Sequence, residues 1–311
     1  MNTPLTSANG SAMSRFCFGC MQFGDKADES ASRVMFDTCR AAGINFFDTA
    51  HAYTGGESER MLGKFAADDR DSLIIATKAA YQGGSSGANI ETTFAESLDR
   101  LGMDSVDILY LHRWDDDTPL EETFETLANL QQAGKFHHIG VSNFAAWQVM
   151  KAEAVAARLG TRIAIIQPMY NLVKRQAEVE ILPMALSEGI AVAPYSPLGG
   201  GLLTGKYAGG DSGRLNENKM YKARYGVDWM HDAAVALAAL GRDLGTDPAT
   251  LAVAWAAHHP GVTAPIISAR NVEQLAPSLA ALSFDMDAAL YDRVSALSPR
   301  PAPATDRLEE V

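Results

Sequence analysis

Short apolar runs alternate along this chain with longer segments of helical periodicity, and this alternation restricts the fold more than any other feature. Eight such runs have the length and the bounding turn or polar residues of buried strands. They are FCFG (16–19), INFFD (44–48), SLIIATK (72–78), VDILYLH (106–112), FHHIGVS (136–142), IAIIQ (163–167), IAVAPYS (190–196) and APIIS (264–268). Because helical segments separate them, the runs predict parallel strands joined by helical crossovers.

The helical candidates have a common end signal. They cover residues 29–42, 57–65, 89–101, 120–133, 145–159, 176–187, 229–258 and 272–280. Glycine follows many of them, as at Gly43, Gly102, Gly134, Gly160 and Gly189, and glycine suits a left-handed helix stop. Eight strand-then-helix units predict an α/β fold, a (β/α)8 TIM barrel forming a single domain over residues 1–311. Residues 298–311 are proline-rich and acidic, and we expect a loosely held tail there.

Composition agrees with one large core and argues against some partners. The chain has 311 residues, 47% of them hydrophobic, and α/β barrels commonly reach this size as one domain. Its 26 basic and 38 acidic side chains give a net charge of -12, which disfavours nonspecific binding to nucleic acid or anionic membranes. No apolar stretch approaches the roughly 20 residues needed to cross a bilayer, and the start lacks an apolar signal core. A cytoplasmic protein is expected, whereas its oligomeric state is not indicated.

Unusual polar residues fall where the predicted strands end. In parallel barrels, active sites are built at the carboxyl ends of the strands. The residues at these ends are Asp48, Lys78, His112, Ser142 with Asn143, Gln167, Tyr195, and Ser268 to Arg270. We therefore expect one site at this rim.

The first of these residues indicate proton-transfer chemistry. A tyrosine such as Tyr53, close to an ammonium group and a carboxylate, is prepared to give up a proton near neutral pH, and an imidazole can steer a polar substrate atom towards it. Taken singly, Asp48 also suits a cap, Lys78 a solvated strand end and His112 a core histidine. Together they indicate proton donation to a carbonyl.

Longer motifs resemble those of the aldo-keto reductase family over nearly the whole chain. They are GCMQFG (19–24), DTAHAYTGGESERMLGK (48–64), IATK (75–78), LYLHR (109–113), GKFHHIGVSNF (134–144), IQPMYNL (166–172), YSPLGGGLLTGKY (195–207) and ISARNVEQL (267–275). The resemblance implies a (β/α)8 barrel, a nicotinamide cofactor held without a separate dinucleotide-binding domain, and reversible reduction of aldehydes or ketones to alcohols. The sequence contains no GxGxxG, which agrees with this.

The resemblance also implies a role for each catalytic candidate. Tyr53 matches the general acid, and Lys78 its cationic partner, expected to lower the phenol's pKa from its usual value of about 10. Asp48 would hold Lys78 in place and keep it charged. His112 would direct the carbonyl oxygen. Such an arrangement supplies an acid for reduction and a base for oxidation.

Cofactor contacts are implied along the later strands. Ser142, Asn143 and Gln167 match the residues that bind the nicotinamide amide, and Tyr195 the aromatic ring that stacks on the nicotinamide. The following glycine-rich segment would lie against the pyrophosphate. Its cofactor-binding candidates are Ser196, Pro197, Leu198, Gly200 and Lys206. This segment nearly spells a P-loop, but Tyr207 stands where a magnesium-binding Ser or Thr is needed.

At the adenosine end, Ser268, Arg270 and Gln274 match the family's ribose and 2′-phosphate contacts. Because Arg270 can grip a phosphate with two hydrogen bonds, NADPH or NADP⁺ is expected, with NADH less favoured. Pro277 and Ser278 stand in place of the family's acidic residue and asparagine.

The substrate is less constrained. By analogy, the pocket would contain Met21, His51, Arg113 and Trp114, which suits a hydroxylated or anionic carbonyl compound such as a sugar aldehyde. Residues 207–228 would form either a lid over the cofactor or a surface loop. A metal site is not expected, since only His112 and Asp48 are candidate ligands at strand ends, and the CxxC of Cys17 and Cys20 lacks supporting context.

One alternative function remains open. Some relatives in this family serve as channel-associated subunits, so a cofactor-sensing binding protein with little turnover is the second hypothesis. The complete catalytic set, and a start of the sequence with no extra segment for a partner, favour the enzyme.

Overall fold

Eight parallel strands form the centre of the protein, whose residues 5–209 and 219–310 are described by a computed structural model. The strands are β1 (Cys17–Gly19), β2 (Phe46–Asp48), β3 (Ile74–Ala79), β4 (Val106–Leu111), β5 (Phe136–Ser142), β6 (Ile163–Gln167), β7 (Ala191–Val192) and β8 (Ile266–Ile267). They are ordered β7-β6-β5-β4-β3-β2-β1-β8. The two ends of this row meet, because the Ile266 amide donates to the Pro194 oxygen at 2.8 Å and Tyr195 forms a parallel bridge with Ile266. The predicted (β/α)8 barrel is confirmed.

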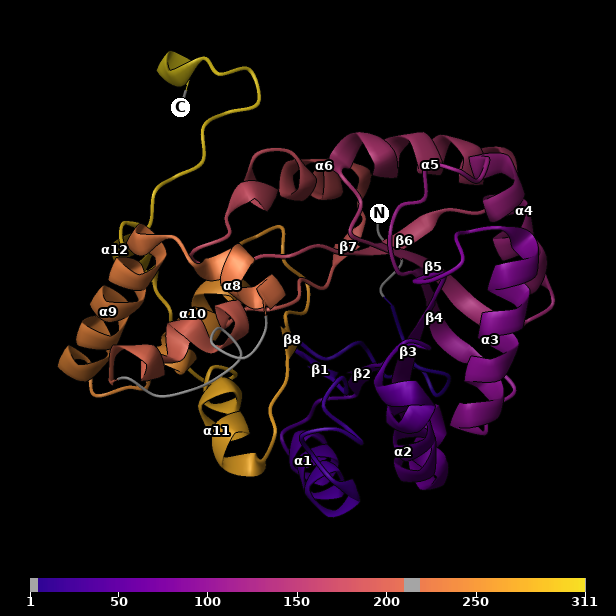
Figure 1. The fold of residues 1–311 in the computed structure, drawn as a ribbon, viewed down its shortest axis with the longest axis horizontal. Coiled ribbons are helices and arrows are strands. Elements are labelled where there is room, and N and C mark those ends of the chain that lie inside the picture. Colours follow the sequence, from indigo (N-terminus) through magenta and orange to yellow (C-terminus); the bar gives the residue numbers. More distant parts are fainter. Residues whose placement is uncertain (1–4, 210–218, 311) are drawn as a thin grey trace.

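Helices surround these strands (Figure 1). The α-helices are α1 (Glu29–Ala41), α2 (Glu57–Ala66), α3 (Gly87–Leu101), α4 (Leu120–Gln132), α5 (Ala146–Arg158), α6 (Ile181–Glu188), α8 (Lys219–Tyr225), α9 (Asp228–Asp243), α10 (Pro248–His258), α11 (Val272–Ala280) and α12 (Ala288–Ser295). Short 3-10 segments are η1 (Thr54–Gly56), η2 (Ala67–Ser72), η3 (Gln176–Glu178), η4 (Gly199–Thr204), η5 (Lys206–Gly209) and η6 (Leu308–Glu310). The predicted glycine stops are confirmed, as at Gly102 and Gly189, with φ of 63° and 65°.

The prediction of one helix over residues 229–258 is wrong, because the chain breaks there between α9 and α10. Gly245 takes a left-handed conformation just after α9. Pro248 has no amide hydrogen to continue a helix, and the Asp247 side chain accepts the Ala249 amide at 2.7 Å to begin a new one. The helix predicted over 176–187 is likewise divided into η3 and α6, and α12 was not predicted.

Strand alternation separates two apolar cores. Phe46, Ile74 and Ile108 belong to the cluster inside the barrel, whereas Phe47 and Ile75 belong to the cluster between the strands and the helices. Successive side chains on a strand point to opposite faces, so every second residue points into the barrel. Continuing each inward series in steps of two residues reaches Asp48 on β2, Lys78 on β3, Gln167 on β6 and, just past β4, His112.

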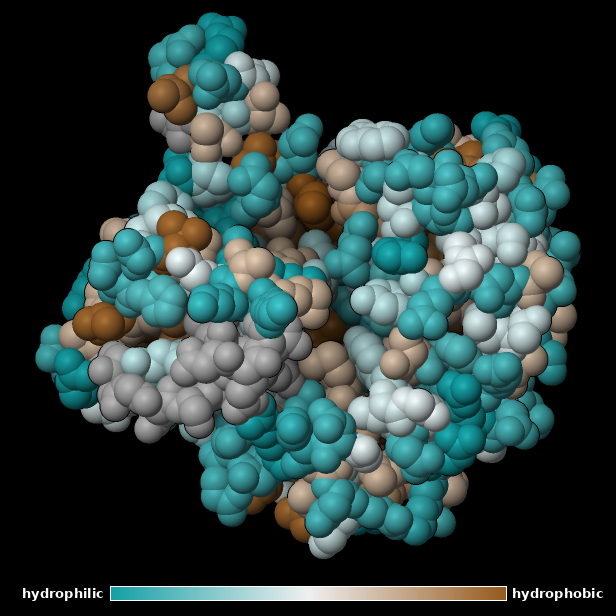
Figure 2. Space-filling view, viewed as in Figure 1, coloured by the Kyte–Doolittle hydropathy of each residue, from teal (hydrophilic) through white to brown (hydrophobic). Residues whose placement is uncertain are grey.

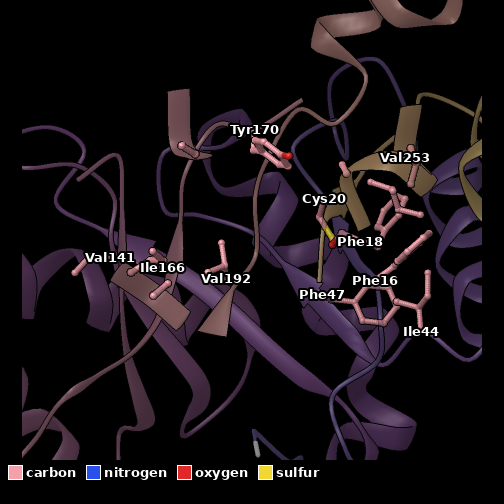
Figure 3. Close-up of a cluster of buried hydrophobic side chains, with 14 of the residues drawn as sticks. Phe16, Phe18, Cys20, Ile44, Phe47, Val141, Ile166, Tyr170, Val192 and Val253 are labelled. Carbon is pink, nitrogen blue, oxygen red and sulfur yellow. The ribbon is translucent and has the colours of Figure 1, made fainter. Parts of the chain in front are cut away.

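Aromatic rings fill the outer core. The Phe36 ring on α1 lies 4.6 Å from the Phe47 ring, and Phe18 lies 6.2 Å from Phe47, measured between ring centroids. Figure 3 shows Phe16, Phe18, Cys20 and Phe47 lying together in this cluster. Cys17, Cys20 and Cys39 are all buried free thiols.

The face drawn in Figure 2 is largely polar, and the C-terminal segment extends away from the barrel in Figure 1. Hydrophilic residues cover most of the face in Figure 2, where hydrophobic residues are scattered or recessed near the middle. The chain after α12 extends away from the rest of the molecule (Figure 1), with Leu308 67% exposed. Within the described residues, we find no helix that is long and apolar enough to span a membrane.

Gly63 tests the packing of α2 against α3. A Cβ atom at Gly63 would overlap the backbone oxygen of Leu101 at the end of α3. We therefore expect Gly63→Ala to lower the free energy of unfolding by about 1–3 kcal/mol, as overpacking does, in denaturant titrations. Lys64→Ala at the next, exposed position is the matched control, with an expected change below ~1 kcal/mol. Equal losses in the two variants would contradict this account of the packing.

Candidate active site

A buried ion pair joins the ends of β2 and β3. Lys78 is 1% exposed, and its Nζ lies 2.5 Å from Asp48 Oδ2. The ammonium group also donates to the Thr49 backbone oxygen at 2.7 Å and to the Tyr53 hydroxyl at 3.3 Å. The structure thus brings together Asp48, Tyr53 and Lys78, which the sequence places in two separate motifs.

Burial and the neighbouring charges together set the protonation of Lys78 and Tyr53. Burial lowers the pKa of Lys78, but the nearby Asp48 and Tyr53 together raise it by more. The pKa of Lys78 therefore lies above its usual value, and the amine stays charged. Burial raises the pKa of Tyr53, and Lys78 lowers it by less. The expectation that Lys78 brings the phenol's pKa below its usual value is therefore not met, since desolvation of the phenolate outweighs the attraction of the ammonium. Tyr53 keeps its proton at neutral pH.

His112 lies beside Tyr53 as a neutral imidazole. Their ring centroids are 5.8 Å apart, nearly perpendicular, and Tyr81 lies against the imidazole at 4.6 Å. Burial, followed by the positive charges of Lys78 and Arg113, lowers the pKa of His112 to about 3. Its Nδ1 is buried and has no hydrogen-bond partner among the described residues. A neutral imidazole has one N–H to donate, which suits an uncharged carbonyl oxygen.

Polar side chains from β5, β6 and the end of β7 form one network with Asp48. Gln167 Nε2 donates to Asp48 Oδ1 at 2.9 Å, and the Ser142 hydroxyl donates to the Gln167 backbone oxygen at 3.0 Å. Asn143 Nδ2 donates to the His112 backbone oxygen at 2.9 Å, and the Tyr195 hydroxyl donates to Asn143 Oδ1 at 2.7 Å. These hydrogen bonds link side chains from neighbouring strands and, between Gln167 and Asp48, from strands that are not neighbours in the sheet.

A cavity of about 580 Å³ opens above this network. Most of the residues proposed from the sequence line it: Met21, Asp48, Tyr53, His112, Ser142, Asn143, Gln167, Tyr195, Ser196, Pro197, Leu198, Gly200, Lys206, Ser268, Arg270 and Gln274. Lys78 is not in the lining, because Asp48 and Tyr53 cover its ammonium group.

His51, Arg113 and Trp114, proposed as substrate-pocket residues, lie outside the lining. His51 Nε2 is 2.7 Å from Glu96, and the Arg113 guanidinium lies 5.4 Å from the Tyr81 ring centroid. Trp114 packs against Phe144 at 5.2 Å.

Among the lining residues that sequence reasoning did not name individually are Ala52 and Tyr81, together with Met220, Tyr221 and Arg224 of α8. Tyr81 is 44% exposed and follows Lys78 closely, so its aromatic type at the end of a strand was an available signal. Met220, Tyr221 and Arg224 lie on α8, within the 207–228 segment that was expected to form a lid or a surface loop. Of that segment, 210–218 lie outside the described residues, so the predicted lid remains a prediction.

A buried ion pair supports the loop that carries Tyr53. Arg100 on α3 binds the fully buried Glu59 on α2 at 3.2 Å and the exposed Glu96 at 3.2 Å. The same guanidinium donates to the His51 backbone oxygen at 3.1 Å. The backbone before Tyr53 is therefore tied to two helices.

The cavity suits a phosphate-bearing cofactor. The Ser268 hydroxyl is buried there and has no hydrogen-bond partner among the described residues, so a polar ligand atom would complete it. Gly200 and Gly201 in the wall have φ of 67° and 96°, a left-handed backbone conformation that favours glycine. Arg270 faces the same space.

Comparison with known proteins identifies the family. The model described as aldo/keto reductase family matches residues 15–299. The uncharacterized oxidoreductase YrpG of Bacillus subtilis is 33% identical over 318 residues, or 95% of each chain. Aflatoxin B1 aldehyde reductase member 2 of Rattus norvegicus is 34% identical over 288 residues, covering 85% of this chain and 78% of its own. A probable voltage-gated potassium channel subunit beta of Oryza sativa subsp. japonica is 35% identical over 291 residues, covering 88% of this chain and 89% of its own.

The chain belongs to the aldo/keto reductase family, which the motifs had indicated. It is an NAD(P)H-dependent oxidoreductase, and the family and its named reductases support carbonyl reduction.

The depressed pKa of His112 predicts acid sensitivity. The imidazole titrates near 6.5 in an unfolded chain and at about 3 in the fold, so between these values the unfolded state binds more protons and stability falls as the pH falls. From pH 7 to pH 5, the wild type should therefore lose about 2 kcal/mol more unfolding free energy than His112→Gln, at 1.36 kcal/mol per pKa unit. Urea titrations at both pH values measure the difference. Identical pH dependence in the two proteins would show that His112 is not buried as the neutral form.

Proposed function

We propose that this protein reduces an aldehyde or ketone to an alcohol with NADPH, and that Tyr53 is the general acid. The observation that carries the proposal is the position of Lys78 Nζ, 2.5 Å from Asp48 and 3.3 Å from the Tyr53 hydroxyl, below a cavity that Tyr53 lines. Such a contact favours tyrosinate as the proton leaves.

Tyr53 and His112 divide the work on the carbonyl oxygen. When bound, a reduced nicotinamide would supply the hydride for the carbonyl carbon. The protonated Tyr53 gives its proton to the carbonyl oxygen, and the neutral His112 donates a hydrogen bond that directs this oxygen. Lys78 stabilises the phenolate that remains, and Asp48 keeps Lys78 charged and fixed.

The remaining network would hold the cofactor. Ser142, Asn143 and Gln167 offer hydroxyl and amide groups for the nicotinamide amide, and the Tyr195 ring would stack on its face. Segment 196–206 would lie along the pyrophosphate, and Ser268, Arg270 and Gln274 would bind the adenosine end. Pro277 lies inside α11 and lines the cavity, whereas Ser278 is buried, so they would add little to the binding of a phosphate.

A cofactor-binding channel subunit with little turnover is the second candidate. Relatives in Oryza sativa and Arabidopsis thaliana named probable voltage-gated potassium channel subunit beta favour it. The complete Asp48, Tyr53 and Lys78 contact set favours the reductase. A screen of aldehydes, sugar aldehydes included, for substrate-dependent loss of NADPH absorbance separates the two candidates. A sugar-aldehyde substrate and a cytoplasmic location stay predictions.

Tyr53→Phe keeps the ring and removes the acidic proton. Turnover should fall by about 100-fold or more, the usual scale for loss of a general acid, while cofactor affinity is retained. Steady-state rates with a good aldehyde, together with a fluorescence titration of cofactor, measure both. Tyr291→Phe on α12, outside the cavity lining, is the matched control. Equal turnover by wild type and Tyr53→Phe would remove Tyr53 from the mechanism.

Arg270→Ala tests the preference for NADPH. The 2′-phosphate of NADPH meets a protein of net charge -12, so a local cation must favour it. A charged hydrogen-bonded contact contributes about 1.5–3 kcal/mol, so Arg270→Ala should weaken NADPH binding by about 10-fold to 100-fold and leave NADH nearly unchanged. Arg293→Ala on α12, exposed, removes the same charge elsewhere and serves as the control. Equal losses for both cofactors would mean that Arg270 supports the fold or the adenine instead.

A further inference from the structure

The wall of the cavity includes one cationic side chain that the proposed chemistry does not use. Its charged lining residues are Asp48, Lys206, Arg224, Asp247 and Arg270. The Asp48 carboxylate is paired with Lys78, and the Asp247 carboxylate caps α10. Arg270 follows β8, at the end proposed for adenosine, and Lys206 lies in the segment proposed for the pyrophosphate. Arg224 on α8 is the one cationic side chain of this set that has no role in the proposed catalysis or cofactor binding.

Two buried tyrosines fix the helix that carries Arg224. A Cβ atom on Gly200 would lie 2.6 Å from the Tyr221 ring, so Tyr221 packs directly on the backbone of η4. The Tyr225 hydroxyl accepts a hydrogen bond from Asn171 at 3.3 Å. Arg224 lies between these anchors, and its guanidinium is 5.7 Å from the Tyr221 ring centroid. The side chain is therefore presented by a firmly packed helix.

Arg224 lines the same cavity as Tyr53, His112 and Tyr195. Burial raises the pKa of Tyr195 to about 12, and the positive charge of Arg224 acts on the same phenol in the opposite direction. Tyr221, which lies under the Arg224 guanidinium, is in turn close enough to Tyr53 to raise the pKa of Tyr53. Arg224 therefore shares one cavity with the groups proposed to act on the carbonyl.

No carboxylate of residues 5–209 or 219–310 forms a salt bridge with Arg224. A guanidinium offers two parallel N–H donors to a planar carboxylate. It balances one negative charge, whereas a phosphate carries about -1.5 to -2 at neutral pH. Because Lys206 and Arg270 are assigned to the phosphates of the cofactor, the charge of Arg224 is left for an anionic group of the substrate, and a carboxylate matches its paired donors.

We propose that Arg224 binds a carboxylate of the substrate, so that the preferred substrates are aldehydes or ketones that also carry an acid group. The inference rests on the proposed reductase function and names its substrate class. Arg224 takes the role of binding an anionic substrate that the sequence had suggested for Arg113. Arg113 lies over the Tyr81 ring and is not part of the cavity lining. It also explains how a chain of net charge -12 can admit an anionic substrate, through one local cation.

A matched pair of substrates tests the proposal. 4-Carboxybenzaldehyde and methyl 4-formylbenzoate have the same reacting carbonyl, and only the first is charged at neutral pH. For Arg224→Gln, kcat/KM with the acid should fall by about 10-fold to 100-fold, mainly through KM, and kcat/KM with the ester should change less than about threefold. Arg224→Lys keeps the charge but not the paired donors, so it should restore part of the loss.

Controls separate this contact from other roles. Lys222→Gln removes an exposed charge from the same helix and should leave the preference for the acid unchanged. Fluorescence titrations should give Arg224→Gln the NADPH affinity of wild type. Equal losses for acid and ester would overturn the proposal, and so would a loss of NADPH affinity, which would assign Arg224 to the pyrophosphate.

Binding keeps the test independent of turnover. With NADP⁺ present, 4-carboxybenzaldehyde should bind wild type about 10-fold or more tightly than it binds Arg224→Gln, also in a Tyr53→Phe background. Equal binding would refute the carboxylate contact. If wild type binds the acid through Arg224 but turns over neither aldehyde, the reductase function fails and the contact remains.

Discussion

The buried pair of Lys78 and Asp48 is the interaction on which the site depends. Two charges in the barrel interior lose their hydration, and only close pairing with additional hydrogen bonds offsets that loss. The Thr49 oxygen and the Gln167 amide supply such bonds, at 2.7 Å to Lys78 and 2.9 Å to Asp48. Removing either partner would leave an uncompensated charge below the Tyr53 hydroxyl. The pair therefore ties the stability of the barrel end to its chemistry.

Backbone strain gathers around the same site. Ala80, Asn143, Ser196 and Thr54 have positive φ although none of them is glycine. Such conformations cost about 1–3 kcal/mol each and persist where the surroundings enforce them. Asn143 is an example of such enforcement. Its side-chain amide donates a hydrogen bond to the His112 backbone oxygen and accepts one from the Tyr195 hydroxyl, so it links the ends of three strands. The strained turns aim polar groups of neighbouring strands at one cavity.

Much of the fold followed from local patterns. Each apolar run became a strand, and the glycine stops appeared where the helices end. Errors arose where two local signals competed, as at Asp247 and Pro248, where apolar periodicity continues across a helix boundary. The placement of His51, Arg113 and Trp114 outside the cavity lining, and of Arg224 within it, followed from packing between distant segments, which no local pattern encodes.

The sequence by itself determined the barrel, the polar residues at the strand ends and the order of the catalytic candidates. Strand periodicity is local, so it assigns Asp48 and Lys78 to the inner face before any partner is known. Tertiary structure decided the protonation states, because the pKa values of Tyr53 and His112 depend on how far water is excluded by residues from other strands. It also decided which cations face the cavity, since α8 reaches the rim only by packing its tyrosines on the glycines of η4.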